Sequence, residues 1–300
     1  MITATQQSKP FLKWAGGKTQ LLGQFEKFFP LRNQYTTYLE PFVGSGAVFF
    51  RLQPDQAHLA DSNEELINCY RQVKNHVEDL FELLRRHKRL HSTKHYYKVR
   101  SFQPDHLNPI ERAARLIYLN KACFNGLYRV NSKGGFNVPM GHYTNPPILD
   151  ETLLRSAHDA LKGVGLHCMR FERFCDEFAG KGDFIYFDPP YFPLSRTSNF
   201  TSYTKDAFRE EDQGKLCEVF EKLDKRGSFL MLSNSASDFI RDLYKKYKKT
   251  THEVYARRAI NCAGDKRSVI KELVILNRGF PQNDDSREKS PEEARSVQRI

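Results

Sequence analysis

The sequence predicts an α/β fold, with a doubly wound and mostly parallel sheet into which a second structural unit is inserted. Short apolar runs that are typical of buried strands alternate with helical patterns along most of the chain. Two of these runs, Ala57–Asp61 and Gly182–Asp188, are separated by residues 62–181, far more than a crossover between neighbouring strands needs. The 300 residues, 39% of them hydrophobic, are enough to bury the core of such a fold.

Two strand–helix pairs open the predicted sheet. Tyr35–Glu40 is a strand-like run that leads into a glycine turn, and Ala47–Leu52 after the turn has a helical pattern. Ala57–Asp61 is a short second strand that ends on an acid, and a long helical pattern follows it from about Glu64 to Arg89. A strand, a turn and a helix in this order are typical of one unit of a doubly wound sheet.

Three further runs complete the predicted sheet after the insert. Gly182–Asp188 is a buried-strand run that stops at two prolines, and the next two runs are Ser228–Ser233 and Glu272–Leu276. A helical pattern from about Phe208 to Leu223 precedes the run at 228–233. We therefore assign residues 1–62 and 170–280 to the sheet domain and residues 63–169 to a mostly helical insert. The polar segment 281–300 is expected to be a disordered tail.

The charge of the chain favours a polyanionic partner. Lys and Arg number 47 against 36 for Asp and Glu, which gives a net charge of +11. Each phosphate that such a protein neutralises releases condensed counterions. No apolar run approaches the roughly 20 residues of a membrane span. The six cysteines form no C-x-x-C pair, which indicates neither a disulfide framework nor a zinc site. We therefore expect a cytoplasmic, nucleoid-associated protein with no membrane and no metal among its partners.

The segment Glu40–Gly46 combines a strand end, glycines and the start of a helix. Gly44 and Gly46 let the backbone pass close to a ligand, and the helix start offers free N–H groups. The segment is neither G-x-G-x-x-G nor a P-loop, because the third glycine and a Lys-Ser or Lys-Thr pair are missing. Asp61 lies where an acid can accept hydrogen bonds from the hydroxyls of a ribose. An ordinary glycine turn and a helix-capping Asp are the alternative interpretation.

A second motif, Asp188-Pro189-Pro190-Tyr191, follows the buried strand at the edge of the sheet where ligands bind. The Asp188 carboxylate and the Pro189 carbonyl oxygen are two acceptors that could hold one exocyclic amino group. Tyr191 beside them offers a surface on which a base could stack. Taken alone, a Pro-Pro step after a strand is also a common way to end the strand.

Two more segments carry aromatic and basic residues together. FLKWAGGK at 11–18 holds the single Trp and two lysines around a glycine pair, and could form a flat wall near a ligand carboxylate or phosphate. A buried Trp that anchors the N-terminus is the alternative. YLNKACFNGLYRVNSKGGFNVPMGHY at 118–143 interleaves aromatics with Arg129, Lys133 and His142. This pattern suits contact with nucleic acid, although charge-rich loops are often only solvated.

In this order the segments resemble the Dam-type DNA adenine-N6 methyltransferases, the D12 class or class alpha. The resemblance runs from Phe11 to Leu276 and rests on FLKWAGGK, EPFVGSG, the acid at 61, DPPY, SRTSNFTSYTKDAF and RRAINCAGDKRSVIKELVILN. The segment 118–143 resembles the target-recognition segment of the members that methylate GATC. The resemblance implies the Rossmann-like fold that binds S-adenosylmethionine, with an inserted, mostly helical DNA-recognition domain.

The resemblance also assigns roles to individual residues. The catalytic positions are Asp188, Pro189, Pro190 and Tyr191. The cofactor positions are Trp14, Lys18, Glu40, Pro41, Gly44, Gly46, Asp61 and Asp188. The DNA-binding positions are Lys13, Phe124, Asn125, Leu127, Arg129 and Pro139, with Lys13 near the outer guanine of the site. Phe124 occupies an intercalating position where related enzymes often carry Tyr; the stacking face is kept, so we expect little effect on specificity.

Together these expectations describe methyl transfer from S-adenosylmethionine to adenine N6 in duplex DNA, within GATC, by base flipping and direct in-line transfer. Neither a metal nor a covalent intermediate is expected. Cytosine-C5 methylation is excluded because it would need a Cys nucleophile beside a Pro, and the chain has no Pro-Cys pair. A monomer is expected, and a dimer on DNA stays open.

Other activities fit the residues less well. N4-cytosine methylation is the nearest rival, and the Asp at 188 rather than a Ser argues against it. An RNA or protein-amide methyltransferase would not need this insert. A DNA-binding regulator with a silent cofactor site would lack one of the catalytic elements, and a dinucleotide oxidoreductase would need G-x-G-x-x-G. Whether the enzyme acts alone or protects DNA from a partner nuclease stays open.

Overall fold

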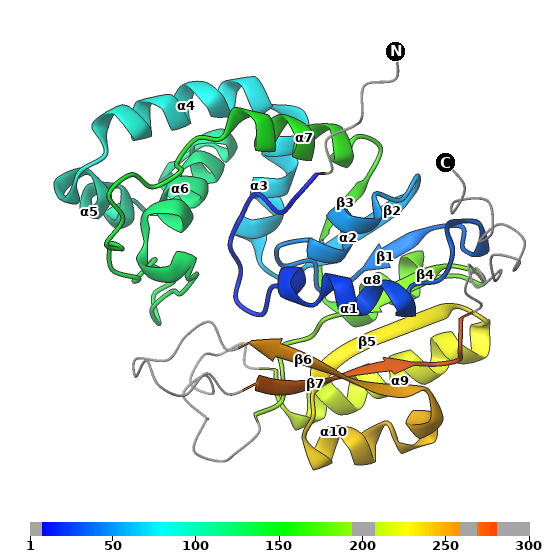
Figure 1. Ribbon diagram of the computed structural model, residues 1–300. Helices are drawn as coiled ribbons and strands as arrows, with labels where there is room; N and C mark the ends of the chain where they lie inside the picture. Colours follow the sequence, from blue (N-terminus) through cyan, green and yellow to red (C-terminus); the bar gives the residue numbers. More distant parts are fainter. Residues whose placement is uncertain (1–7, 194–207, 258–268, 281–300) are drawn as a thin grey trace, which may run out of the picture.

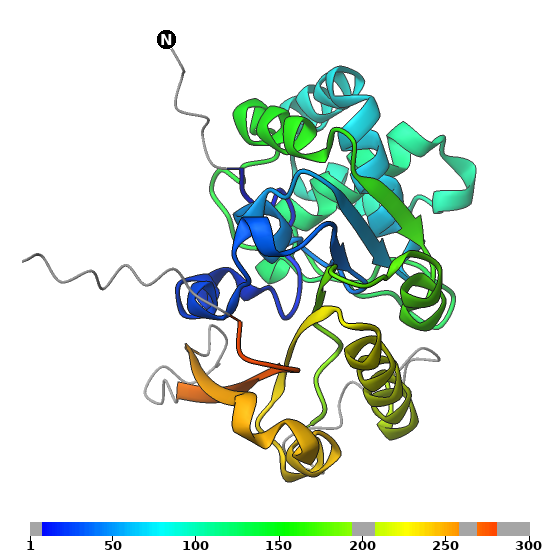
Figure 2. The same ribbon diagram turned by 90° about the vertical axis from the view of Figure 1, so that its right-hand side faces the viewer.

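An open β-sheet and a group of helices beside it make up the described part of the chain (Figure 1, Figure 2). The structure is a computed structural model, and it describes residues 8–193, 208–257 and 269–280. Within these residues the strands form one seven-stranded sheet with the order β3-β2-β1-β4-β5-β7-β6. The predicted α/β fold is therefore confirmed. The expected tail at 281–300 lies outside the described residues, as does most of SRTSNFTSYTKDAF and part of RRAINCAGDKRSVIKELVILN.

Five strands of the sheet run parallel and two run antiparallel, among the residues that the structure describes. The parallel strands are β1 (Tyr38–Glu40), β2 (Ala57–Asp61), β3 (Gly165–Cys168), β4 (Phe184–Phe187) and β5 (Phe229–Ser235). The antiparallel strands are β6 (Thr251–Arg257) and β7 (Val269–Leu276), with β7 between β5 and β6. Each of the five predicted runs overlaps one strand, and β5 and β7 are longer than predicted. Because the parallel strands share a direction, their carboxyl ends meet at one edge of the sheet.

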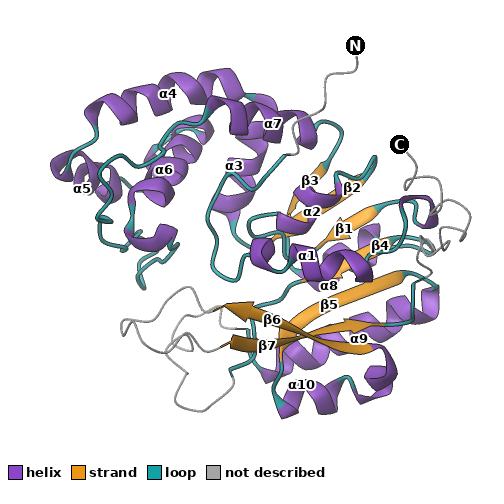
Figure 3. Ribbon diagram, in the orientation of Figure 1, coloured by secondary structure: helices purple, strands orange, loops and turns teal. Residues whose placement is uncertain are grey.

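Helices cover both faces of the sheet (Figure 3). Side chains of successive strand residues point to opposite faces, so Phe184 and Tyr186 of β4 belong to one hydrophobic core and Ile185 and Phe187 to the other. One core includes residues of α1 (Leu22–Phe25) and α2 (Ala47–Leu52), and the other includes residues of α8 (Phe171–Phe178), α9 (Glu210–Arg226) and α10 (Asp238–Leu243).

Five helices lie in the connection between β2 and β3: α3 (Glu64–Asn75), α4 (Val77–Leu90), α5 (Thr93–Ser101), α6 (Pro109–Ala122) and α7 (Glu151–Leu161). Side chains cap the start of four of them, α3, α5, α6 and α7. The Asn63 side chain accepts from the Leu66 N–H at α3, and a capping box of Asn108 and Glu111 opens α6. The predicted single helix over Glu64–Arg89 is wrong in one respect. It is interrupted at His76, whose φ of −138° is not helical.

The expected insert, residues 63–169, shares both strand pairing and a hydrophobic core with the sheet. Strand β3 pairs with β2 and so belongs to the sheet, although the sequence placed it inside the insert. The inserted helices also bury their apolar side chains in a core that continues into the core on one face of the sheet. A catalytic unit of 1–62 with 170–280 and a recognition unit of 63–169 remains a prediction.

The outer edge of β6 is covered by the N-terminal helices. The side-chain amide of Gln24 donates to the Tyr255 carbonyl at 2.9 Å and accepts from the Tyr255 N–H at 3.0 Å. The ring of Phe28 stacks on His252, with ring centroids 4.6 Å apart. Across the described ranges, no helix is both long enough and apolar enough to pass through a lipid bilayer.

Candidate active site

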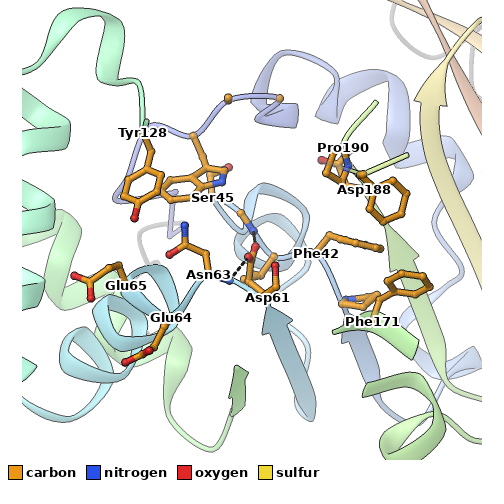
Figure 4. A pocket seen from close by; sticks show the side chains of 18 of the residues that line it. Phe42, Ser45, Asp61, Asn63, Glu64, Glu65, Tyr128, Phe171, Asp188 and Pro190 are labelled. Carbon is orange, nitrogen blue, oxygen red and sulfur yellow. Dashed lines mark hydrogen bonds between the residues drawn. The ribbon is translucent and has the colours of Figure 1, made fainter. Parts of the chain in front are cut away.

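Three acidic side chains at the carboxyl edge of the sheet line one cavity of about 1210 Å³. Figure 4 shows two of them, Asp61 and Asp188, on different sides of this cavity. Glu40 ends β1, Asp61 ends β2 and Asp188 follows β4. This convergence follows from the parallel direction of the three strands. The same cavity is lined by six more of the predicted catalytic and cofactor residues: Trp14, Lys18, Pro41, Gly44, Pro190 and Tyr191. The two remaining predicted residues, Gly46 and Pro189, belong to the same two loops but are not among the lining residues.

Asp188 is paired with a buried lysine from the N-terminal segment. Lys18 Nζ lies 2.7 Å from Asp188 Oδ1, and the two side chains are 4% and 18% exposed. Lys18 also donates to the Gly16 carbonyl, and its Nζ lies 4.5 Å from the centroid of the Tyr191 ring. One lysine therefore contacts two members of the DPPY motif.

A buried hydroxyl supplies a second donor to the same carboxylate oxygen. Ser233 of β5 donates to Asp188 Oδ1 at 2.9 Å, and the Tyr186 and Ser233 hydroxyls lie 2.9 Å apart. Because the single Ser233 proton is used toward Asp188, the Tyr186 hydroxyl donates to Ser233. Burial raises the pKa of Asp188, and Lys18 and Ser233 oppose this rise. Both donors bind Oδ1, and within the described ranges no donor to Oδ2 is found.

Tyr191 is fixed by an acid from the antiparallel part of the sheet. Its hydroxyl donates to Glu272 Oε2 at 2.5 Å. Glu272 is opposite Ser235 in the β5–β7 register, so β7 brings it to the carboxyl end of β5. Burial raises the pKa of Glu272, and the hydrogen bond from Tyr191 opposes this rise.

Two buried amide side chains, Gln213 and Asn234, form hydrogen bonds with the backbone of the loop that contains DPPY. Gln213 of α9 donates to the Pro190 carbonyl at 3.1 Å and accepts from Asn234 at 3.1 Å. Asn234 in turn accepts from the Phe192 N–H at 3.4 Å. The hydrogen bonds found among the described residues leave the Pro189 carbonyl oxygen without a donor. That oxygen and Asp188 Oδ2 are thus two acceptors of one short loop.

The glycine loop after β1 is built around a buried tyrosine. Gly46 has a φ of +68°, and a Cβ there would lie 2.8 Å from the Tyr70 hydroxyl. Tyr70 donates to the Gly44 carbonyl at 3.1 Å. Gly46 is therefore required by the packing of the loop against α3, rather than by direct contact with the cavity.

The two other acids differ in their surroundings. Asp61 accepts from the backbone N–H groups of Asn63 at 2.9 Å and Gly44 at 3.3 Å (Figure 4). Burial raises its pKa, and these hydrogen bonds oppose the rise. Glu40 is 2% exposed and accepts from the Tyr38 hydroxyl at 2.8 Å. Burial raises the pKa of Glu40 well above its usual range, so a cationic group bound beside it would favour its charged form.

Aromatic rings form two walls of the cavity. Phe42 and Phe171 face each other with ring centroids 5.3 Å apart, and Phe208 is 5.7 Å from Phe42. On the other wall Trp14 stacks on Tyr128, with centroids 5.0 Å apart and an angle of 24° between the rings. Such walls suit a flat, partly apolar ligand. In the described part of the chain, no group of three or more His, Cys, Asp or Glu side chains is arranged to hold a metal ion.

The predicted DNA-binding residues lie on one hairpin and on the segment beside it. The β-bridges Cys123↔Met140 and Val130↔Phe136 pair the two sides of the hairpin, residues 123–140. Of the six predicted residues, five belong to this hairpin: Phe124, Asn125, Leu127, Arg129 and Pro139.

Contacts inside the hairpin hold these residues in place. Phe124 is 43% exposed, and its N–H donates to the Pro139 carbonyl at 2.9 Å. Arg129 is exposed, and its Nε donates to Asn137 Oδ1 at 2.7 Å. Asn125 has a φ of +55°, in the left-handed region that asparagine tolerates.

Lys13 is tied to the hairpin by a buried amide. The Asn120 side chain accepts from the Lys13 N–H at 2.9 Å and donates to the Lys13 carbonyl at 2.7 Å and the Gly126 carbonyl at 3.0 Å. The Lys13 ammonium lies 5.2 Å from the centroid of the Tyr143 ring. All six predicted DNA-binding residues therefore lie in one region next to the cavity.

Sequence reasoning did not name four residues that shape this site: Ser233, Glu272, Tyr128 and Asn63. Ser233 ends a predicted strand, so the rule that selected Asp61 and Asp188 could have selected it as well. Glu272 begins its predicted strand, and only the antiparallel direction of β7 brings it to the same edge. Tyr128 was hidden among the aromatics of the recognition segment. Asn63 carries only the signal of a helix cap.

An open α/β sheet with a cavity at the carboxyl ends of its parallel strands is the ligand-binding arrangement of the doubly wound class. The sequence model described as D12 class N6 adenine-specific DNA methyltransferase matches residues 14–260. The chain belongs to this family.

Curated relatives extend the similarity along the chain. The type II methyltransferase M1.LlaDCHI of Lactococcus lactis subsp. cremoris is 46% identical over 277 residues, which cover 90% of this chain and 96% of that protein. The type II methyltransferase M.MjaIII of Methanocaldococcus jannaschii is 47% identical over 288 residues, with 90% and 99% covered. The DNA adenine methylase of Escherichia coli K12 is 34% identical over 275 residues, with 90% and 96% covered.

Family membership confirms several predictions. The resemblance to Dam-type, D12-class enzymes is confirmed, and the fold is that of the S-adenosylmethionine-dependent methyltransferases. The chain is an adenine-specific DNA methyltransferase, which uses a methyl donor and acts on DNA.

Proposed function

We propose that the protein transfers a methyl group from S-adenosylmethionine to adenine N6 within GATC, on a base that it extrudes from the duplex. The observation that carries this proposal is the arrangement at the DPPY loop. Asp188 Oδ2 and the Pro189 carbonyl oxygen are two acceptors on one loop, while Lys18 and Ser233 hold Oδ1. Adenine N6 presents two hydrogens, one for each acceptor.

The residues of the cavity fit S-adenosylmethionine as the donor. Asp61 at the end of β2 is suited to the two ribose hydroxyls. Glu40, buried and raised in pKa, favours a cationic neighbour such as the amino group of the methionine part. Phe42 and Phe171 offer an aromatic wall to the adenine ring. When bound, this cofactor supplies an electrophilic methyl group on a sulfonium.

The protein's own residues would act by alignment and electrostatics. Adenine N6 is a poor nucleophile because its lone pair is delocalised into the ring. When Asp188 Oδ2 and the Pro189 carbonyl accept the two N6 hydrogens, the nitrogen becomes more tetrahedral and its lone pair is freed for in-line attack. Tyr191, fixed by Glu272, would stack on the extruded base. Asp188, whose pKa burial raises, is suited to take the proton that N6 releases after transfer.

The target site is proposed from the recognition hairpin. Arg129 and the predicted intercalating residue Phe124 are both exposed on this hairpin, and Lys13 is tied to it through Asn120. An exposed guanidinium can bind a guanine edge with two hydrogen bonds, which suits the guanine of GATC. The greater identity to proteins named type II methyltransferases than to those named DNA adenine methylase favours a role of the type II kind.

The test is methyl transfer from labelled S-adenosylmethionine to two duplexes that differ only in GATC and its scrambled form GTAC. Label recovered as N6-methyladenine from the GATC duplex alone is the expected result. Label in both duplexes would keep the reaction and remove the proposed site. Label in neither duplex, with cofactor still bound, would contradict the proposed target.

A further inference from the structure

The ring of Tyr128 joins the cavity to the recognition hairpin. Tyr128 lies in the chain between Leu127 and Arg129, two of the predicted base-reading residues. Its ring stacks on Trp14 at a centroid distance of 5.0 Å. Tyr128 and Trp14 both line the cavity. One side chain of the hairpin is thus part of the wall of the cofactor cavity.

On the side of the cavity, this stack touches the loops that would hold the cofactor. A Cβ at Gly44 would lie 3.1 Å from Trp14 Cδ1, so the glycine loop packs directly against the indole. The Asn63 side-chain amide points toward the Tyr128 hydroxyl (Figure 4). Burial raises the pKa of Tyr128, and the contact with Asn63 opposes this rise. Asn63 also donates through its N–H to Asp61, the predicted ribose acceptor.

On the side of the hairpin, the same ring is held by a buried aromatic. Tyr128 meets Phe136 edge to face with centroids 6.0 Å apart, and Phe136 is 6% exposed. Phe136 pairs with Val130 across the hairpin. A displacement of the Tyr128 ring would therefore be passed to both sides of the hairpin.

We propose that Tyr128 is a positioning residue that couples occupancy of the cofactor cavity to the arrangement of the recognition hairpin. A ligand that fixes the Gly44 loop and Asp61 then holds Trp14 and Tyr128, and so favours the hairpin arrangement that binds the target site. By linkage, target DNA tightens cofactor binding by the same factor. This inference rests on the proposed cofactor and target. One aromatic pair predicts a coupling of about 2- to 12-fold.

The experiment measures the affinity for a fluorescent GATC duplex by anisotropy, with and without saturating S-adenosylhomocysteine, which cannot react. The ratio of the two dissociation constants is the coupling factor. Tyr128→Leu removes the ring, Tyr128→Phe keeps the stack and loses the hydroxyl, and Tyr97→Ala is the matched control. Tyr97 is an exposed tyrosine of α5 in the same insert that does not line the cavity.

The expected result is a coupling factor above 2 in the parent protein and in the Tyr97→Ala and Tyr128→Phe variants, and a factor near 1 in Tyr128→Leu. In titrations without DNA, the affinity of Tyr128→Leu for S-adenosylhomocysteine should differ from that of the parent protein by a much smaller factor than the coupling factor does. A coupling factor that survives in Tyr128→Leu, or that is absent from the parent protein, overturns the inference. Loss in all three variants makes the effect a general one and also overturns it.

Two further measurements keep the outcomes separate. If circular dichroism shows that Tyr128→Leu does not fold, Phe136→Leu loosens the same ring from the hairpin and should reduce the coupling; an unchanged factor there overturns the inference. Methyl transfer by the parent protein on the GATC duplex is measured in parallel. A parent protein that methylates GATC without coupling refutes the role of Tyr128 alone, whereas one that neither methylates nor binds S-adenosylhomocysteine refutes the proposed function.

Discussion

Replacing Lys18 by Met tests whether burial makes the Lys18–Asp188 pair important for stability. Met keeps most of the volume of the lysine stem and removes the charge. The Asp188 side chain, 18% exposed in the parent protein, then keeps the Ser233 hydroxyl as its donor. Breaking a buried ion pair from one side costs about 3–5 kcal/mol, and the partial exposure of Asp188 places this pair near the lower end. We expect the free energy of unfolding to fall by about 3 kcal/mol at neutral to alkaline pH.

The chain offers a surface pair with the same separation as a control. Arg32 Nη2 lies 2.7 Å from Asp55 Oδ1, but these side chains are 41% and 92% exposed. Arg32→Met should lower the free energy of unfolding by less than about 1 kcal/mol, because water screens an exposed pair. Urea denaturation of both variants measures the difference. An equal loss in the two variants would refute the argument that burial, rather than distance, sets the energy.

The loss in Lys18→Met should also depend on pH. Burial already raises the pKa of Asp188, and removal of the cation raises it further. A carboxyl group with a raised pKa in the folded state binds a proton more readily there than in the unfolded chain. The free energy of unfolding therefore falls as pH rises from the pKa of Asp188 in the unfolded chain to its higher pKa in the folded variant. It is recovered as pH falls again. Asp188→Asn in the Lys18→Met background should restore most of the loss at high pH. A loss that is the same at all pH values would contradict a charged Asp188.

Three further predictions follow from the site. Asp188→Ala should abolish methyl transfer from labelled S-adenosylmethionine while DNA binding by gel shift stays largely intact; retained turnover would remove the assigned role. Arg129→Ala should reduce discrimination at one base pair by about 1–3 kcal/mol in competition binding, whereas an equal loss on all sequences would indicate a phosphate contact. Gly46→Ala should lower the free energy of unfolding by about 2–4 kcal/mol in urea, because its φ is +68° and its Cβ would meet the Tyr70 hydroxyl. Its control, Gly214→Ala in α9, has nothing within 4 Å and should stabilise by about 1 kcal/mol; similar effects at both glycines would contradict the packing argument.

The sequence predicted those helices and strands that are marked by apolar runs and turn residues of their own. The helix at 47–52 and the strand at 57–61 have the predicted bounds, because apolar runs and turn residues mark both. Strand β6 was missed because only Val254 of its described side chains is buried, so an edge strand of polar residues lacks the apolar run. Strand β3 was also missed, because it is four residues long and has no fully buried side chain, so it lacks the apolar run of a buried strand. The break at His76 carries no Gly or Pro to announce it.

The sequence predicted which residues line the site, but it did not predict which of them contact one another. Strand direction alone brings Glu40, Asp61 and Asp188 to one edge. The pairing of Lys18 with Asp188 depends on how the N-terminal segment crosses that edge, and no spacing within the chain encodes this. The stack of Trp14 on Tyr128 likewise depends on packing between residues far apart in sequence.

The side-chain amide of Gln24 protects the edge strand β6 from pairing with a strand of another molecule. A strand at the end of a sheet normally presents unpaired N–H and C=O groups, which another chain can use as a template. At Tyr255 a single side chain satisfies both groups and so acts as a one-residue strand. The Phe28 ring shields the neighbouring His252. The N-terminal helices thereby cover the β6 edge at these two residues, and we expect Gln24→Ala to expose the Tyr255 N–H and C=O groups to pairing with another chain.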